Sequence, residues 1–173
     1  VGEGAWNQKG SDILGEGSGD KSGSVISISS DGSRVAIGAD KNDDAGINAG
    51  HVRVYEFSSG DWSQLGADID GAAAIDVSGR SVSLSSDGNK VAIGAIRNDA
   101  GGDEAGHVRV FEFSSVSDSW TQLGGEITGE AAGDQSGISV SLSSDGSVVA
   151  IGATLNSGAG TNAGHVRVFN YTA

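Results

Sequence analysis

The sequence predicts an all-β protein with almost no helix, and three observations support this. Val and Ile, with Ala, make up most of the aliphatic residues, and they favour strands because their branched β-carbons pack on a pleated surface. The chain has 30 Gly and no Pro, so its turns must use Gly, Asn, Asp and Ser. Several segments alternate apolar and polar residues with the strand period of two, and none shows sustained helical periodicity.

One pattern of residues occurs three times along the 173-residue chain, at intervals of 56 and then 58 residues. Each copy contains the sequences W-x-Q-x-G, S-S-D-G-x-x-V-A-I-G-A and A-G-H-V-R-V. Such a period indicates that each copy is one structural unit of a repeat architecture. The structural repeat positions are Trp6, Trp62, Trp120, His51, His107, His165, Arg53, Arg109 and Arg167.

Each copy is predicted to hold four strands. In the second copy, "SVSLSS" (81–86) alternates and leads into Asp87-Gly88, a tight-turn signal, after which "KVAIGA" (90–95) returns. The segments 107–113 and 120–127 supply the third and fourth strands. Four strands in meander order at this period are typical of a β-propeller blade. The predicted blades are 24–71, 81–129 and 139–173.

Glycine within the predicted second strand of each blade supports this fold. Gly38, Gly94 and Gly152 would weaken a strand unless another backbone approaches closely, as it does between blades packed face to face. A β-trefoil, which also has three four-stranded units, is the alternative. Its units are usually shorter, and it normally buries larger aliphatic residues in a common core.

The second copy, "SGRSVSLSSDGNKVAIGA" followed by "AGHVRVFEF", resembles the FG-GAP repeat of integrin alpha-type β-propellers. Ser78-Gly79 stands where that family has Phe-Gly, Gly94-Ala95 matches its Gly-Ala, and Ile96 replaces its Pro. Similar divergent repeats occur in large secreted and surface proteins of microbes and algae. The calcium-binding loop of the family is not matched, because the connection at 86–88 is too short to supply six oxygens.

The third predicted blade has no fourth strand after it, whereas a segment with the sequence of a fourth strand lies at Trp6 to Ile13, within residues 1–14. Three blades are too few for a closed ring, since four is the practical minimum. We therefore expect self-association, in which a second chain completes a six-bladed ring with exchanged strands. A longer array of repeats is the alternative.

The formal net charge of −13 and the absence of a basic stripe exclude nucleic acid as a partner. No apolar run is long enough to cross a bilayer, and the absence of Cys excludes thiolate chemistry. Abundant Ser, Gly and Asp with little Lys favours an extracellular or cell-surface location.

The triplicated His-x-Arg pair invites a catalytic interpretation, but an enzyme seldom needs one site per blade. We interpret it as an inter-blade contact, with Asp20, Asp76 or Asp134 as candidate partners. No nucleophile elbow and no carboxylate pair in a defined cleft is indicated, so we expect no enzyme activity.

The loop between the second and third strands varies most between copies, and its acids and amides suit a calcium ion or a sugar. A solvated connector is the simpler interpretation. The candidate metal ligands are Asp43, Asp44, Asp99 and Asp103, and the candidate ligand-loop residues are Asn42, Asn98, Glu104 and Asn156.

These features favour an extracellular, non-enzymatic interaction or structural module of a surface or adhesive assembly. The first alternative is a multivalent carbohydrate-binding lectin, with one weak site per blade. The second is an accessory propeller of a secreted polysaccharide-degrading enzyme.

Overall fold

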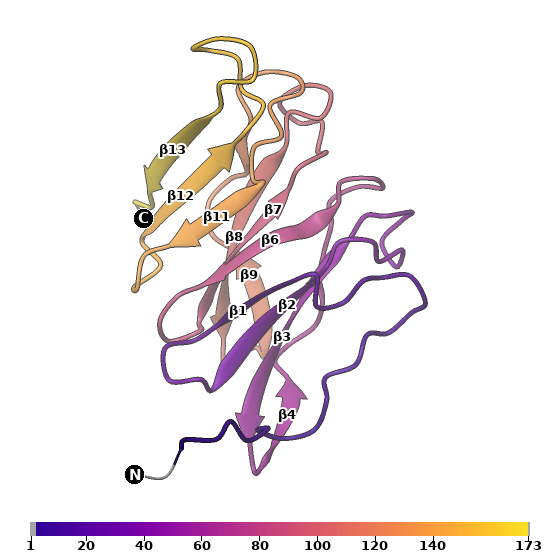
Figure 1. Cartoon of the computed structure of the whole chain (residues 1–173), viewed down its shortest axis with the longest axis vertical. Coiled ribbons are helices and arrows are strands. Elements are labelled where there is room, and N and C mark those ends of the chain that lie inside the picture. Colours follow the sequence, from indigo (N-terminus) through magenta and orange to yellow (C-terminus); the bar gives the residue numbers. More distant parts are fainter. Residues whose placement is uncertain (1–2, 173) are drawn as a thin grey trace.

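The computed structural model describes residues 3–172 and arranges them as three antiparallel β-sheets stacked along the long axis of the molecule (Figure 1). This confirms the predicted all-β architecture, with sheets that resemble propeller blades. No helix that could span a membrane occurs in this part of the chain. The strands are β1 (Val25–Ile28), β2 (Arg34–Ala39), β3 (His51–Ser58), β4 (Asp61–Gln64), β5 (Ile69–Asp70), β6 (Ser78–Leu84), β7 (Lys90–Ala95), β8 (His107–Ser114), β9 (Ser119–Gln122), β10 (Ile127–Thr128), β11 (Ser139–Leu142), β12 (Val148–Ala153) and β13 (His165–Asn170).

Each sheet is a meander in which neighbouring strands in sequence are neighbours in space. Blade 1 has the order β1-β2-β3-β4, with β5 also pairing with β3. In blade 2, β6-β7-β8 is likewise followed by β9 and β10, which both pair with β8. Blade 3 contains only β11-β12-β13.

The predicted fourth strand is two short strands rather than one. Trp120 lies in β9 and Ile127 in β10, and the chain between them bends at Gly124, whose φ is +67°. The bend lets one segment pair twice with β8 and then cross to the next blade. Period-two alternation does not reveal such a break, because the glycine disrupts the ladder without changing the apolar pattern.

The Asp-Gly turns between the first two strands form as the sequence predicts. Asp31 accepts hydrogen bonds from the hydroxyls of Ser29 and Ser33 and from the backbone N–H of Ser33. Gly32 takes a φ of +66°, which its lack of a β-carbon permits. Asp145 holds the third turn in the same way, with Ser143 and Ser147.

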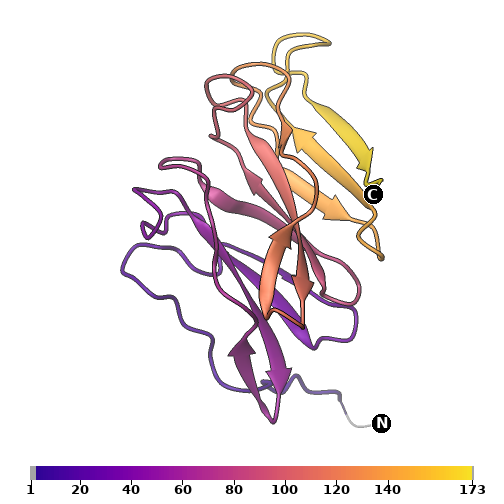
Figure 2. The same cartoon turned by 180° about the vertical axis from the view of Figure 1, so that it is seen from behind.

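The blades stack face to face, as the two opposite views show (Figures 1 and 2). Small residues and aliphatic side chains fill the junctions between them. A β-carbon added at Gly38 would lie 2.3 Å from the carbonyl oxygen of Gly79, and one at Gly94 would lie 2.1 Å from that of Gly137. The close backbone approach expected at these glycines is therefore present at both blade junctions. The main hydrophobic core lies between blades 1 and 2.

The segment Trp6 to Ile13, predicted as a fourth blade strand, forms no strand ladder within this chain. Figure 1 shows the reason, because the N-terminal segment lies beside blade 1 while β13 lies at the far end of the stack. The two elements that the sequence would pair are thus out of reach of each other in one chain.

Candidate functional site

A tryptophan from the fourth strand fits into the same kind of seat at two places in the molecule. Trp120 donates its indole N–H to the carbonyl of Leu65 at 2.8 Å, and its ring packs 5.3 Å from the ring of Phe113. The Cα of Gly66 approaches the indole so closely that a β-carbon there would lie 3.1 Å from it. A carbonyl, a glycine and an aromatic ring therefore define a Trp seat.

The first blade repeats this arrangement with the N-terminal segment in place of the preceding blade. Trp62 donates to the carbonyl of Lys9 at 2.7 Å and packs 5.2 Å from Phe57. A β-carbon at Gly10 would lie 2.9 Å from the indole ring. Residues 9–14 thus lie against blade 1 as residues 65–70 lie against blade 2.

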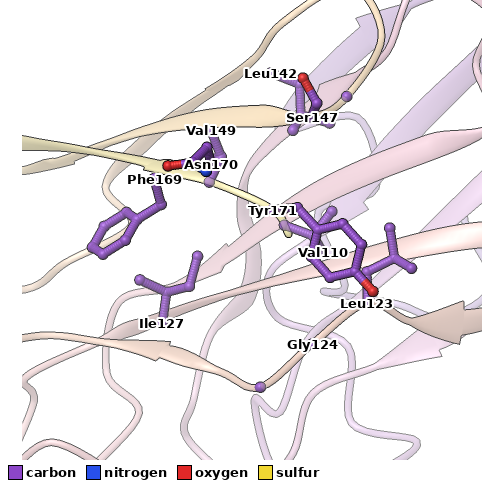
Figure 3. Close-up of a pocket in the computed structure, with 12 residues that line it drawn as sticks. Val110, Leu123, Gly124, Ile127, Leu142, Ser147, Val149, Phe169, Asn170 and Tyr171 are labelled. Carbon is purple, nitrogen blue, oxygen red and sulfur yellow. The ribbon is translucent and has the colours of Figure 1, made fainter. Parts of the chain in front are cut away.

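The third seat is open, because no tryptophan among residues 3–172 occupies it. Leu123, Gly124 and Tyr171 take the places of the carbonyl, the glycine and the aromatic ring. The nearest atoms to a β-carbon at Gly124 belong to Tyr171, at 3.6 and 3.8 Å. These residues, with Phe169 and Ile127 among others, line a pocket of about 200 Å³ (Figure 3).

Two apolar faces at the ends of the stack have buried counterparts inside it. On β1, Ile26 is 65% exposed. The equivalent Val82 on β6 is only 7% exposed, because it packs against blade 1. On β13, Val168 is 64% exposed. The equivalent Val54 on β3 is only 1% exposed, because it packs against blade 2. The free face of blade 1 therefore corresponds to the blade 2 side of the junction between blades 1 and 2, and the free face of blade 3 corresponds to its blade 1 side.

The repeated arginines connect each blade to the segment that precedes it. Arg109 donates to the carbonyl of Asp70 at 2.5 Å, and Arg53 donates to that of Leu14 at 2.9 Å. Arg167 makes the same contact with Thr128, and all three guanidinium groups lie 5.2–5.5 Å from an aromatic ring of their own strand.

The inter-blade interpretation of these arginines agrees with this geometry, but the partners differ from the predicted Asp20, Asp76 and Asp134. Those carboxylates instead accept hydrogen bonds from the buried amides of Asn42, Asn98 and Asn156, at 2.9–3.1 Å. A backbone carbonyl has no sequence signature, so the true acceptor of each Arg could not be read from the residues.

The candidate ligand-loop residues mostly bond within their own loops. The oxygen of each repeated Asn accepts a backbone N–H two residues further on. Asp43 and Asp99 accept backbone N–H groups from the residues at positions 48 and 104, and Ser157 does the same in blade 3. Glu104 lies 3.5 Å from Arg97 and also accepts from Gln135. Asp103 is exposed.

Of the four candidate metal ligands, only Asp44 belongs to a cluster with metal-ligand spacing among residues 3–172. It gathers with Glu16, His51 and Asp68, whose potential ligand atoms all lie within 4.8 Å of one another. The sequence did not indicate this group, because its members come from four separate segments. The recurrence of His51 at a fixed repeat position was the only available signal.

Comparisons with known proteins support the fold. Neither a protein-family profile nor a curated protein sequence matches the chain. Among solved structures, a periplasmic gluconolactonase from Pseudomonas aeruginosa, PpgL, is similar with a TM-score of 0.53 and 17% identity, over 86% of this chain and 39% of that one. Hydrazine synthase from Kuenenia stuttgartiensis is similar with a TM-score of 0.51 and 12% identity, over 92% of this chain and 36% of that one.

Both similar structures are β-propeller proteins, and this chain spans less than two fifths of the length of either. At these identities the likeness concerns the fold alone. The chain therefore has the fold of part of a β-propeller, built from internal blade repeats.

Proposed function

We propose that this chain is a non-enzymatic structural and interaction module that joins copies of itself head to tail through its free blade faces. The observation that carries the proposal is the open Trp seat at Leu123, Gly124 and Tyr171, together with the exposed Trp6 at the other end of the molecule. The repeat register makes Trp6 the equivalent of Trp62 and Trp120.

The internal junctions specify how two copies would meet. Trp62 pairs with Phe57, and Trp120 pairs with Phe113, so Trp6 of one copy would lie opposite Tyr171 of the next. The same pairing places the β1 face of one copy, which carries Ile26, against the β13 face of the other copy, which carries Val168. Both faces are then buried. Two copies joined at both faces make a six-bladed ring with twofold symmetry.

The contacts of the repeated polar residues favour a structural role over catalysis. Each Arg bonds to a backbone carbonyl of the preceding segment, and each Asn bonds to a buried Asp. The indoles of Trp62 and Trp120 each donate a hydrogen bond to a backbone carbonyl in their seats, which supports a packing role for these two residues.

An FG-GAP-like, surface-exposed assembly is the setting that we propose for this module. Its support is the resemblance of the repeat and the acidic, Cys-free composition. A head-to-tail propeller presents its variable β2–β3 loops together on one rim, and repetition of weak sites there would strengthen binding to a surface protein through avidity.

Analytical ultracentrifugation of the intact chain and three variants tests the proposal. We expect the intact chain to sediment above its 17.1 kDa monomer mass at micromolar concentration. Trp6→Ala should weaken association at least about 30-fold, since a buried central tryptophan contributes about 2 kcal/mol or more. Val168→Asp should prevent association, because it places a charge in the apolar junction.

Val116→Asp is the matched control, because Val116 is equally apolar and fully exposed but lies in the β8–β9 loop, away from both faces. This variant should associate like the unmodified chain. A monomeric intact chain, or equal weakening by all three substitutions, would contradict the proposal.

A further inference from the structure

His51 is a buried residue whose Nδ1 has no hydrogen-bond partner. The residue is 1% exposed, and Nδ1 points to Asp68 and Glu16, whose carboxylate oxygens lie 3.7 and 3.9 Å away. Both distances are longer than a hydrogen bond. A buried polar atom without a partner is costly, and such an atom in a native structure calls for an explanation, one of which is a bound ion.

Three carboxylates lie close to this imidazole. Glu16 comes from the N-terminal segment, Asp44 from the β2–β3 loop and Asp68 from the bend before β5, while His51 opens β3. Among residues 3–172, the Lys or Arg side chain that forms an ion pair with these carboxylates is Arg53, which lies 3.2 Å from Glu16.

We propose that Glu16, Asp44, His51 and Asp68 bind one divalent transition-metal ion, for which Zn²⁺ is the probe. One imidazole nitrogen with three carboxylates suits such an ion, whereas Ca²⁺ and Mg²⁺ prefer oxygen ligands alone. Zinc bonds of about 2.0–2.1 Å would place tetrahedral ligand atoms about 3.3 Å apart. The side chains need only small movements, since the present separations are at most 4.8 Å.

The other two blades show what an incomplete version of the site looks like. His107 is equally buried, and its Nδ1 lies 3.4 Å from Glu126, the counterpart of Asp68. The places of Glu16 and Asp44 are taken by Ala72 and Ala100, so blade 2 offers two ligands instead of four. Blade 3 pairs His165 with Glu130 at 3.6 Å and has Gly158 in place of Asp44.

The ion would also have a structural effect, because Glu16 belongs to the segment that carries Trp6. Binding would fasten this segment to blade 1 at a point beyond its contacts through Lys9 and Leu14. The proposed site is nevertheless independent of self-association, since all four ligands belong to one chain.

Calorimetric titration of the chelator-treated intact chain with ZnCl₂ tests the site, with CaCl₂ in a parallel titration. We expect one equivalent of Zn²⁺ and a weaker response to Ca²⁺. Asp44→Ala should weaken Zn²⁺ binding by at least about 10- to 100-fold, because loss of even a supporting group at a metal site costs that much. His51→Gln should also abolish binding, with circular dichroism used to check that the variant folds.

Asp103→Ala is the matched control, since it removes an exposed acid from the equivalent loop of blade 2. It should leave Zn²⁺ binding unchanged. No Zn²⁺ binding by the intact chain, or equal weakening by Asp44→Ala and Asp103→Ala, would overturn the proposal.

The double substitution Ala72→Glu and Ala100→Asp tests the ligand set from the opposite direction. It gives blade 2 the residues of blade 1 around His107 and Glu126, so the variant should bind two equivalents of Zn²⁺. A single equivalent would show that this arrangement of four ligands is not what holds the ion, and would contradict the assignment.

Discussion

Single residues in the Asp-Gly turns show how reliably local chemistry can be predicted here. The repeated S-S-D-G sequence predicts a tight turn in each copy, and Asp31 and Asp145 each accept hydrogen bonds from two serines of their own turn. Every group involved lies within two residues in the sequence, so the pattern contains the whole interaction. The acceptors of the repeated Arg residues lie 39 residues away and are backbone atoms, which no residue pattern reveals.

The turn aspartates should make stability depend on acid pH. The hydroxyl of Ser29, then the N–H and hydroxyl of Ser33, lower the pKa of Asp31 to about 2, and Ser143 and Ser147 do the same for Asp145. A pKa lowered by folding contributes stability above its unfolded value, and this stability is lost as pH falls from about 4 through 2. Asp31→Asn should therefore reduce the urea midpoint at pH 7 and leave it nearly unchanged near pH 2.

The exposed Asp118 provides the control, because Asp118→Asn removes the same charge from a loop away from the Asp-Gly turns. Equal changes of the urea midpoint for the two variants at pH 7 and at pH 2 would show that the turn hydrogen bonds do not lower the pKa as described.

At the scale of elements, the four-strand blade was predictable because alternation, turn signals and the repeat all agree. The split of the fourth strand into β9 and β10 was not, because it depends on a positive φ at one glycine. The proposed metal cluster could not be predicted from the sequence either, because its ligands come from the N-terminal segment, a loop, a bend and the start of β3. Tertiary structure alone brings these segments together.

Equivalent glycines in the second strands give a test of how blades pack. Gly94→Ala would place a β-carbon 2.1 Å from the carbonyl of Gly137, so we expect a loss of about 1–3 kcal/mol in unfolding free energy. Gly152→Ala meets only atoms of Ser139, whose hydroxyl can rotate away, and should cost much less. Thermal or urea unfolding of both variants measures this difference.

Gly152 lies on the free face of blade 3, so its substitution should have a second effect. Gly152→Ala should weaken self-association even though the variant remains folded, because the next copy's backbone would approach it as Gly137 approaches Gly94. Equal losses of stability in the two variants would contradict the description of blade packing.

At the scale of the whole molecule, both ends of the blade stack present surfaces that are buried inside it. The sequence predicted this relation, because the register of the repeats shows which strand blade 3 lacks and where a matching strand lies. It could not show that the seat for the missing Trp is already formed by Leu123, Gly124 and Tyr171. That feature depends on the bend at Gly124 and on the position of β13.

In the proposed assembly, copies join head to tail with the register of the internal blades. That register pairs Glu56 with Ser63 and Glu112 with Thr121, so it places Asn170 of one copy opposite Asn7 of the next. The chain contains no Cys, and an Asn7→Cys, Asn170→Cys variant therefore carries the only two thiols. Within one chain, Asn7 belongs to the N-terminal segment and Asn170 ends β13, and these two elements lie at opposite ends of the stack (Figure 1).

The most direct measurement is the mass of this double-cysteine variant after mild oxidation, by denaturing mass spectrometry. Head-to-tail assembly predicts a disulfide-linked species of at least twice the chain mass of 17.1 kDa. A second variant, Asn7→Cys with Val116→Cys, has one thiol away from both faces and should remain a single chain. A single-chain mass for the Asn7→Cys, Asn170→Cys variant, or equal cross-linking of the two variants, would contradict head-to-tail assembly.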